Sequence, residues 1–312
     1  LFLQEFISLC EITIMKFGNV DNPQDIDFTL PKDHPDTLKV LNKSHSEKTN
    51  VFVGCPNWNK SDLKGFYPRG TKELLEYYSR QFNSIEFNAT FYRIFPPEQF
   101  EKWYSKTPNN FKFFPKLNQE ISHWKRLNED INPVIDNYLY SALNLKEKLG
   151  CIFLQTPHNF TPKDFQRVVS FTESWPKEIP LAIEFRHTAW FNDHEVSKDL
   201  YQLLEENNIS NIIVDSAGRR DIMHMRLTNS RAFIRFVGAN HQCDYSRLDD
   251  WIQRLKNWKY LGMNDINIFV HQNIEKESPL LSAYLIRKMN LELGTDLKIP
   301  NDDSYGQQIV FK

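Results

Sequence analysis

Residues 181–187 read LAIEFRH, and the order of apolar and charged residues in this stretch decides the fold. The side chains of a β-strand point alternately to its two faces. Glu184 and Arg186 therefore share one face of the predicted strand, and the apolar residues share the other. The apolar face suits packing under helices, which leaves the charged face directed to the opposite side of the sheet. The residues of the apolar face are Leu181, Ile183 and Phe185.

Seven further runs predict strands, because β-branched and aromatic residues favour extended backbone. The starts of the eight runs lie 21 to 40 residues apart. A parallel crossover needs about a dozen residues or more, so every gap admits one. The seven runs are residues 51–56, 84–90, 111–117, 151–157, 211–217, 232–238 and 267–273.

Most of the gaps between these runs show the apolar periodicity of helices. Strands and helices that alternate in this way predict an α/β fold of the TIM-like (β/α)8 barrel type. Residues 221–229, between the sixth and seventh strands, are too few for more than a turn or two of helix. We therefore expect the barrel to be slightly irregular there. The predicted helices are residues 71–80, 97–106, 131–148, 162–174, 193–207, 245–261 and 279–290.

The barrel is expected to occupy residues 51–290, with an N-terminal extension over 1–50 and a C-terminal tail over 291–312. The extension is rich in Pro, Asp, Lys and Ser and predicts an extended lead-in. Its first 14 residues lack the basic start and cleavage site of a signal peptide and are too short to span a bilayer. We expect Met15 to be the natural start and no membrane association.

The composition excludes several classes of protein. With 40% hydrophobic and 25% charged residues the chain is ordinary globular material, and its net charge of −2 gives no general attraction to nucleic acid. The four cysteines form no C-x-x-C pair, which fits free thiols in a reducing cytoplasm. Nucleotide-binding glycine loops, G-x-S-x-G and H-E-x-x-H are absent, so no cofactor is predicted.

The alternation of each strand places a set of polar residues toward the inside of the barrel. Most of them fall in the later halves of their strands, near the carboxyl ends, where barrel enzymes keep their sites. Asp215 is also expected to point inward, although Ile213 makes that strand ambiguous. The other inward polar residues are Ser84, Glu86, Asn88, Thr90, Lys116, Gln155, Glu184, Arg186, Arg235 and His271.

Each of these charges taken alone could be a structural ion pair. Glu184 and Arg186, for example, could simply neutralise each other. Burying six charged or titratable groups together costs several kcal/mol for every unpaired ion, so a fold that needed only stability would use aliphatic residues there. The set therefore favours a functional site. The loop over residues 118–126 is polar and reads either as a lid or as an ordinary solvated loop.

Two motifs follow the strand ends: Glu-x-Asn-x-Thr-Phe-Tyr at residues 86–92 and Glu-Phe-Arg-His-x-x-Trp at residues 184–190. On these motifs the chain resembles the family known as domain of unknown function 72, the YecE-like proteins, over about residues 51–290. The resemblance implies a TIM-like barrel in a cytoplasmic bacterial protein and names no reaction. Further matching stretches are VGCPNW (53–58), GFYP (65–68), FFPK (113–116), ISH (121–123) and FLQTP (153–157).

Two positions depart from the pattern that the resemblance implies. The family's Arg-x-His-Gly reads Arg-Phe-Val-Gly at residues 235–238, so Val237 stands where a histidine is usual. The family's Phe-x-Asn-Asn is replaced at residues 269–273 by FVHQN, which contains His271. An activity carried by those groups would be altered or lost in this chain.

The first functional hypothesis is an enzyme, a hydrolase or an isomerase, that acts on a small polar anion such as a phosphorylated or carboxylated compound. Glu184, Glu86 and His271 are the candidate catalytic acids and bases. Guanidinium and ammonium groups suit an anionic substrate. The candidate substrate-binding residues are Asn88, Tyr92, Lys116, Gln155, Arg186, Trp190, Arg235 and Trp58, the two tryptophans because they follow strand ends.

Three alternatives remain open. A metal-dependent isomerase or hydrolase would use Glu86, Glu184, Asp215 and His271 as ligands, although the nearby cations would compete for the carboxylates. A glycosidase would need Glu86 and Glu184 roughly 5–10 Å apart. A non-catalytic protein would bind a metabolite or a nucleic-acid phosphate, with the near-neutral net charge disfavouring long nucleic-acid tracks.

Overall fold

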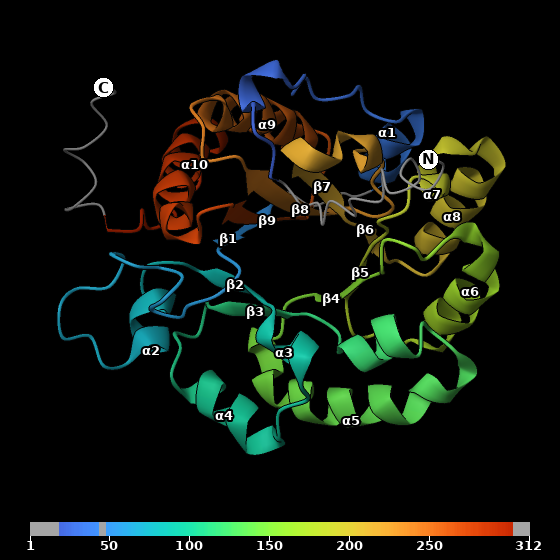
Figure 1. The fold of residues 1–312 in the computed structure, drawn as a ribbon, viewed down its shortest axis with the longest axis horizontal. Helices are drawn as coiled ribbons and strands as arrows, with labels where there is room; N and C mark the ends of the chain where they lie inside the picture. The colour runs from blue at the N-terminus through green and yellow to red at the C-terminus, as the bar shows by residue number, and fades with distance from the viewer. Residues whose placement is uncertain (1–18, 44–47, 302–312) are drawn as a thin grey trace, which may run out of the picture.

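Short parallel strands form three sheets in residues 19–43 and 48–301, which this computed structural model describes. The strand orders are β1-β9-β8-β7, β2-β3 and β4-β5-β6, and every pairing is parallel. Figure 1 shows the strands in the middle of the molecule with helices around them. The strands are β1 (Asn50–Gly54), β2 (Ser84–Phe87), β3 (Lys112–Pro115), β4 (Ile152–Gln155), β5 (Leu181–Glu184), β6 (Ser210–Asn211), β7 (Ile213–Ser216), β8 (Arg231–Gly238) and β9 (Asp265–Gln272).

Backbone hydrogen bonds also connect one sheet to the next. The N–H of Glu86 in β2 donates to the carbonyl of Cys55, just after β1, over 3.2 Å. Leu117 donates to Phe153 of β4 over 2.8 Å. At Gly54 a Cβ atom would lie 2.3 Å from the carbonyl oxygen of Ser84, so only glycine allows β1 and β2 to approach this closely.

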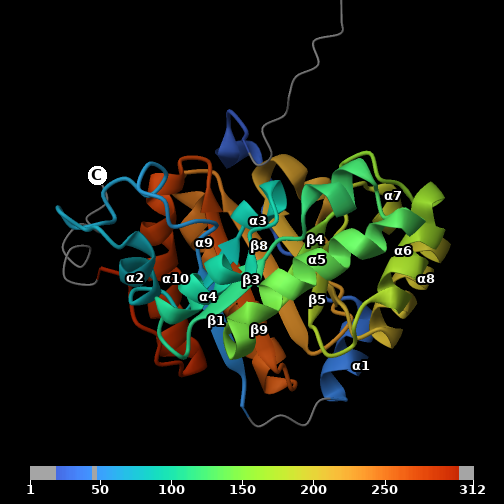
Figure 2. The same ribbon diagram turned by 90° about the horizontal axis from the view of Figure 1, so that it is seen from below.

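All seven predicted helices are present, with ends that differ by a few residues from the predicted ones. Figure 2 shows two further short helices, α3 (Ala89–Tyr92) and α7 (Ala189–Asn192), at the edge where the strands end. The predicted second strand, residues 84–90, had extended into α3, whereas the predicted fifth strand, residues 181–187, stopped just before α7. The seven helices are α2 (Leu74–Ser79), α4 (Pro97–Ser105), α5 (Asn132–Ala142), α6 (Phe165–Ser174), α8 (His194–Glu206), α9 (Cys243–Tyr260) and α10 (Ser278–Leu293).

Apolar side chains form two separate clusters, one on each face of the strands. The larger cluster packs the strands against the helices and contains Ile183 and Phe185, as the alternation in residues 181–187 predicted. The smaller cluster occupies the other face and is built mainly from phenylalanine rings. The rings of Phe114 and Phe269 meet edge-on with centroids 4.9 Å apart, and those of Phe233 and Phe269 are tilted with centroids 5.2 Å apart.

Asp215 was expected to point inward, and this prediction is wrong. Val214 belongs to the smaller cluster, so Asp215 lies on the opposite face, where it is bound by Arg247 (2.8 Å) and Trp251 (2.7 Å) of α9. Ile213 shares that face and must pack under the helices. The arginine of α9 neutralises the aspartate there, which is why a charge is tolerated in an apolar layer.

The first five strands end two or three residues earlier than predicted, and for the second and the fifth this changes where an inward polar residue lies. The second ends at Phe87, so Thr90 lies in α3 instead of pointing inward from a strand. Its hydroxyl bonds to the backbone carbonyl of Lys116 over 2.8 Å and ties α3 to the end of β3. The fifth strand ends at Glu184, and Arg186 therefore lies in the segment that follows it.

The connection from β7 to β8 is irregular, as predicted, and contains only the 3-10 helix η6 (Ala217–Ile222) within the described chain. A segment from the N-terminal extension packs there instead. This segment, α1 (Pro35–Asn42), was predicted to be extended, and that prediction is wrong. Pro35 begins the helix and the side chain of His34 accepts a hydrogen bond from the N–H of Asp36, two signals that the sequence already carried.

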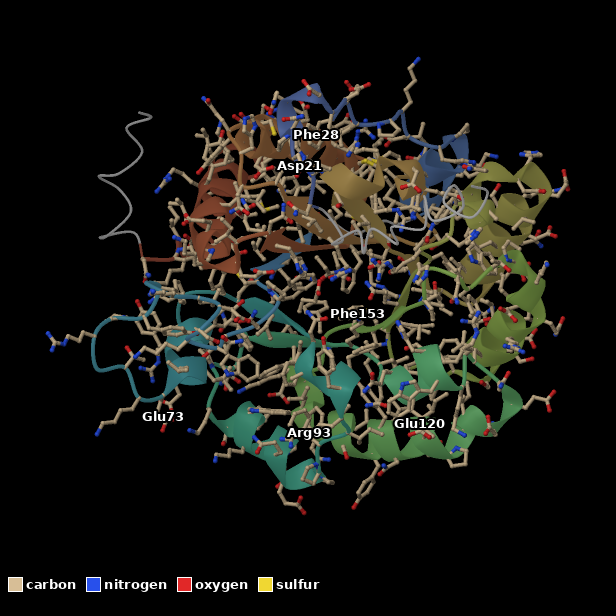
Figure 3. All side chains as sticks on the ribbon, viewed as in Figure 1. Asp21, Phe28, Glu73, Arg93, Glu120 and Phe153 are labelled. Carbon is tan, nitrogen blue, oxygen red and sulfur yellow. The ribbon has the colours of Figure 1, made fainter. Side chains whose placement is uncertain are left out.

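Helix α1 is fastened by one buried hydroxyl. The side chain of Thr37 donates to the carbonyl of Met225 over 2.9 Å and accepts from the N–H of Leu227 over 3.1 Å. The residues before α1 lie against α9, where Asp33 accepts a hydrogen bond from Trp258 over 3.1 Å. Figure 3 shows Phe28 on this side of the molecule, and its ring lies 4.3 Å from the guanidinium of Arg247.

In residues 19–43 and 48–301 no helix is both long and apolar enough to cross a membrane. The predicted start at Met15 and the second half of the predicted tail, residues 302–312, lie outside the described residues. Helix α10 extends three residues beyond the predicted end of the barrel, to Leu293.

Replacing Thr37 by Val should destabilise the protein by about 1–3 kcal/mol, because it leaves a buried backbone N–H without its acceptor at almost unchanged volume. Urea unfolding measures this change. Thr71→Val is the matched control, since the hydroxyl of Thr71 bonds to the carbonyl of Pro68 in an exposed turn; its effect should stay within about 0.5 kcal/mol. Equal stability of the two variants would show that α1 does not hold this part of the fold.

Candidate functional site

Six polar side chains from six different strand segments form one hydrogen-bonded group, which we call the charged cluster. It lies in the later halves of the strands or just after them, on the face of the smaller apolar cluster. Figure 3 shows Phe153 near the middle of the molecule, and the Arg235 guanidinium lies 5.9 Å from the centre of its ring. The members are Glu86, Lys116, Gln155, Glu184, Arg235 and His271.

Arg235 is the centre of the charged cluster. Its Nε and Nη2 donate to the two carboxylate oxygens of Glu86, each over 2.9 Å. Its Nη1 donates to Oε2 of Glu184 over 2.6 Å. Both carboxylates are completely buried. One guanidinium thus bridges two buried carboxylates from β2 and β5, and the bidentate pair with Glu86 fixes its plane.

The electrostatics of the cluster follow from this bridge. Burial raises the pKa of Glu86, but the charges of Arg235 and His271 outweigh burial and hold the pKa well below its ordinary value. Glu184 behaves likewise: burial raises its pKa, and Arg235, with other cations, brings it below the ordinary value. Burial lowers the pKa of Arg235, and the two carboxylates more than restore it. Both glutamates are therefore anionic at neutral pH.

Gln155 continues the network toward a lysine. Its amide nitrogen donates to Oε1 of Glu184 over 2.8 Å, and its amide oxygen accepts from Nζ of Lys116, also over 2.8 Å. Burial, together with the positive charge of Arg235, lowers the pKa of Lys116 to about 7. This amine therefore exists in substantial part as a neutral group near neutral pH.

His271 extends the cluster on the other side. Its Nε2 lies 3.1 Å from Oε2 of Glu86, and its Nδ1 lies 3.8 Å from Oε1 of Glu275. Burial raises the pKa of Glu275. Asn88 donates to the other oxygen of Glu86 over 2.8 Å. The imidazole is thus held between a firmly ionised carboxylate and one that protonates more readily, and its side chain is 12% exposed.

Arg186 lies at the edge of the charged cluster. Its Nε is 3.6 Å from Oε1 of Glu184, and its side chain is 19% exposed. The predicted proximity of Glu184 and Arg186 is therefore present. Arg235, at 2.6 Å, is the closer partner of the carboxylate. Arg219, from η6, donates to the backbone carbonyl of Arg186 over 2.7 Å and fixes the segment that follows β5.

The three aromatic residues predicted to bind substrate do not lie in the charged cluster. Trp190 is fully buried, packs against Phe185 in the larger apolar cluster and donates to a backbone carbonyl. Trp58 stacks on Phe87, with centroids 4.9 Å apart, also under the helices. Tyr92 is 70% exposed on α3. A position just after a strand end does not determine which face of the sheet a ring covers. The two tryptophans pack on the helix side, and the tyrosine faces solvent.

Two aromatic groups that the sequence pattern did not select lie over Lys116. The ring of Phe91 is 4.3 Å from the lysine Nζ, and the ring of His123 packs edge-on against Phe91, 4.9 Å away. Burial and the positive charge of Lys116 lower the pKa of His123 to about 4, so this imidazole is neutral. His123 lies in a short helical turn inside the predicted loop 118–126. The ISH stretch of the resemblance was the available signal for it.

The four predicted metal ligands do not form one set. Glu86 and His271 are in contact, and Glu184 lies across Arg235 from them. Asp215 belongs to the network on the helix side. No group of three or more His, Cys, Asp or Glu side chains in residues 19–43 and 48–301 is arranged to hold a metal ion.

A family model described as "Protein of unknown function DUF72" matches residues 52–303, which is most of the chain. The chain belongs to the DUF72 family. The UPF0759 protein YecE of Escherichia coli K12 is 27% identical over 279 residues, which cover 81% of this chain and 99% of YecE. The UPF0759 protein YunF of Bacillus subtilis is 25% identical over 208 residues, covering 62% of this chain and 71% of YunF.

Solved DUF72 structures share the fold. The crystal structure of a DUF72 protein from Thermotoga maritima matches with a TM-score of 0.62 at 25% identity, and covers 78% of this chain and all (100%) of its own. A DUF72 protein from Enterococcus faecalis matches with a TM-score of 0.62 at 18% identity over 80% of this chain and 100% of its own.

The two departures from the DUF72 pattern lie side by side. Val237 of β8 and His271 of β9 are partners in the strand register. Val237 has the same parity as Arg235 and lies on the same face. The resemblance implies a histidine at position 237. Here an imidazole is found instead on the adjacent strand at the paired position, where it contacts Glu86.

Replacing Arg235 by Met in this DUF72 protein should cost about 3–5 kcal/mol of stability at about pH 8, because two buried carboxylates lose their counter-ion. In the parent, the lowered pKa values stabilise the fold above the ordinary glutamate value of 4.5, and this contribution is lost only as the pH falls toward the lowered values. In the variant, burial raises these pKa values instead, so protonation should relieve part of the loss at about pH 5. Urea unfolding at both pH values measures the difference.

The matched control for this prediction is Arg167→Met. Arg167 pairs with Asp164 over 3.2 Å, and its side chain is 40% exposed, so its loss should cost less than about 1 kcal/mol at either pH. A deficit in Arg235→Met that stays the same or grows as the pH falls would contradict the assignment of two ionised carboxylates to one guanidinium.

Proposed function

We propose that this DUF72 protein is an enzyme that acts on a small polar anion, phosphorylated or carboxylated, by general acid/base chemistry at the carboxyl ends of its strands. The observation that carries the proposal is the charged cluster: six polar groups from six strand segments meet on one face, where stability alone would favour aliphatic residues. The pKa of Lys116, which is lowered to about 7, also supports the proposal, because strongly shifted pKa values are common at functional sites.

The proposal includes a fold of the closed, TIM-like (β/α)8 type. The bonds between Glu86 and Cys55 and between Leu117 and Phe153 support continuity between sheets, as does the bond from the N–H of Ile212 to the carbonyl of Ile183. The smaller apolar cluster, with its phenylalanine rings, would be the filled interior that such barrels have. The charged cluster would then lie above it, at the end where barrel enzymes carry out their chemistry.

In this proposal His271 carries the proton. Its Nε2 lies 3.1 Å from Oε2 of Glu86, which orients the ring, and its partial exposure brings the ring to the edge of the cluster. Glu86 would therefore act mainly by orienting the imidazole. Glu184 keeps the role of a candidate acid or base, although its lowered pKa makes it a weak one and favours an electrostatic contribution.

Arg186 is the proposed anchor for the anion. It is the most exposed of the guanidinium groups around the carboxylates, and a planar fork suits phosphate and carboxylate groups. Arg235 was predicted to share this task. Each of its three nitrogen atoms already donates to a carboxylate, so we now propose that it fixes the two glutamates. Lys116, Gln155 and Asn88 would line the site around them.

The glycosidase alternative is less well supported. Glu86 and Glu184 bind opposite sides of one guanidinium, which occupies the space where a water molecule and a glycosidic bond would have to lie. A non-catalytic protein that binds a metabolite or a nucleic-acid phosphate would use the same cations and is the alternative that experiment must separate.

The free thiols fit a protein of the cytoplasm, which the proposal includes. Cys55, Cys151 and Cys243 form no disulfide within the described chain. Thiols of this kind are typical of a reducing compartment.

The test is a panel of small phosphorylated and carboxylated compounds, followed for binding by calorimetry and for turnover by mass spectrometry. We expect at least one compound to be converted. His271→Gln should lower kcat by about 10²–10⁴-fold, the usual contribution of a positioned acid or base, with binding nearly unchanged. Arg186→Gln should instead weaken binding by tenfold or more. Arg167→Gln, which removes an exposed guanidinium elsewhere, is the control and should change neither.

The outcomes separate the two classes of function. Binding that depends on Arg186 without turnover of any compound would favour the non-catalytic alternative. No binding of any anion, or binding that is unaffected by Arg186→Gln, would refute the proposed site.

A further inference from the structure

Lys116 differs from the other buried lysine of the described chain in how its amine is satisfied. Nζ of Lys148 donates to two backbone carbonyls, those of Tyr104 at 2.7 Å and Thr107 at 2.6 Å. Such contacts are those of a structural ammonium group. Nζ of Lys116 has a single hydrogen-bond acceptor among the described residues, the amide oxygen of Gln155, and it forms no ion pair with them.

The surroundings of the Lys116 amine combine apolar rings with cations. The ring of Phe91 lies 4.3 Å away and that of Phe153 lies 6.0 Å away. Four neighbouring charges act on the pKa of this amine. Arg235 and Arg186 oppose its protonation, and Glu184 and Glu86 favour it. Neutral His123 packs on Phe91 above it.

Such a setting is the one that activates a lysine as a nucleophile. An amine is unreactive when protonated, and it becomes a nucleophile when burial or a neighbouring cation favours its neutral form. The two carboxylates that could pair with this ammonium group are held by Arg235 instead. Gln155 accepts one N–H, which orients the nitrogen without supplying a counter-charge.

We infer that Lys116 forms a covalent imine with the carbonyl carbon of a small anionic aldehyde or ketone, whose charged group is held by Arg186. The inference rests on the proposed function and narrows its substrate class to anions that carry a carbonyl group. Lys116 then becomes a covalent participant instead of one more group that attracts an anion.

The step balances without any further reagent. The electron pair of the neutral amine forms a C–N bond to the carbonyl carbon, and the carbonyl oxygen takes up a proton as the nitrogen releases one. The resulting carbinolamine then loses its hydroxyl group and a second nitrogen proton as water, which gives C=N. One amine and one carbonyl thus yield one imine and one water, with no change of oxidation state.

The test uses glyoxylate as the probe, a very small anionic aldehyde, with cyanoborohydride to reduce the imine to a stable amine. Peptide mass spectrometry then gives the labelling rate of each lysine. At about pH 7 we expect Lys116 to be labelled at least tenfold faster than Lys112. Lys112 begins β3, the strand that Lys116 follows, and its Nζ donates to the backbone carbonyl of Glu147 at an exposed position. The rate at Lys116 should rise with a midpoint of about pH 7, whereas lysines of ordinary pKa stay protonated there.

Four variants sharpen the result. Lys116→Met and Lys116→Arg should both lose the fast label, and the arginine variant keeps the length and charge if the methionine variant fails to fold. Arg186→Gln should slow the labelling of Lys116 by tenfold or more. Lys112→Gln is the matched control and should leave the fast label unchanged.

The inference and the proposed function fail separately. Labelling of Lys116 no faster than that of Lys112 would overturn the imine, and turnover that needs His271 would still support the proposed enzyme. Fast labelling that disappears in Lys116→Arg would support the imine even if no compound of the panel is converted.

Discussion

The interior of this protein depends on one guanidinium group. Strand alternation carries Glu86 and Glu184 to the same buried face, where each unpaired ion would cost several kcal/mol. Arg235 reaches both carboxylates from a third strand and neutralises them in part through a bidentate pair. Two negative charges against one positive charge leave a deficit of cations, which explains why Arg186 lies against Glu184 and His271 against Glu86.

The same arrangement determines which neighbouring groups are ready for chemistry. The carboxylates are firmly ionised, and they are therefore better at orienting and stabilising other groups than at exchanging protons. Lys116, whose pKa is lowered to about 7, is linked to Glu184 through Gln155, and His271 contacts Glu86 directly at the edge of the charged cluster. A rigid ionic centre with adjustable groups around it is an arrangement that suits catalysis, because the centre needs no rearrangement during the reaction.

The sequence predicted the alternating strands and helices and the face on which the charged cluster lies, because strand parity is a local rule. The alternation at residues 181–187 placed Glu184 correctly, and the same rule placed Glu86, Gln155 and Arg235. The rule failed where a residue's face is decided by a distant partner. Asp215 faces the helices because Arg247, which lies 32 positions later in the chain, binds its carboxylate on that side.

The aromatic residues show a related limit. Trp58 and Trp190 follow strand ends, but the direction of a ring in a loop depends on which pocket is left open by packing. Strand parity could not select His123, because its position in the site depends on Phe91 and Lys116 in other segments; only the ISH stretch of the resemblance pointed to it. Helix α1 was missed for a different reason: polar composition outweighed the local signals of Pro35 and His34, and only tertiary contacts stabilise so short a helix.

The position of α1 has a consequence for the order in which the chain can assemble during synthesis. Its buried threonine pairs with Met225, which lies 188 positions later in the chain. At usual translation speeds of about 5–20 residues per second, the ribosome delivers that partner roughly 10–40 s after α1 has been made. An isolated eight-residue helix is not stable in water, so this segment stays without its final structure throughout that interval. The part of the described chain that is translated first is therefore among the last to reach its native contacts.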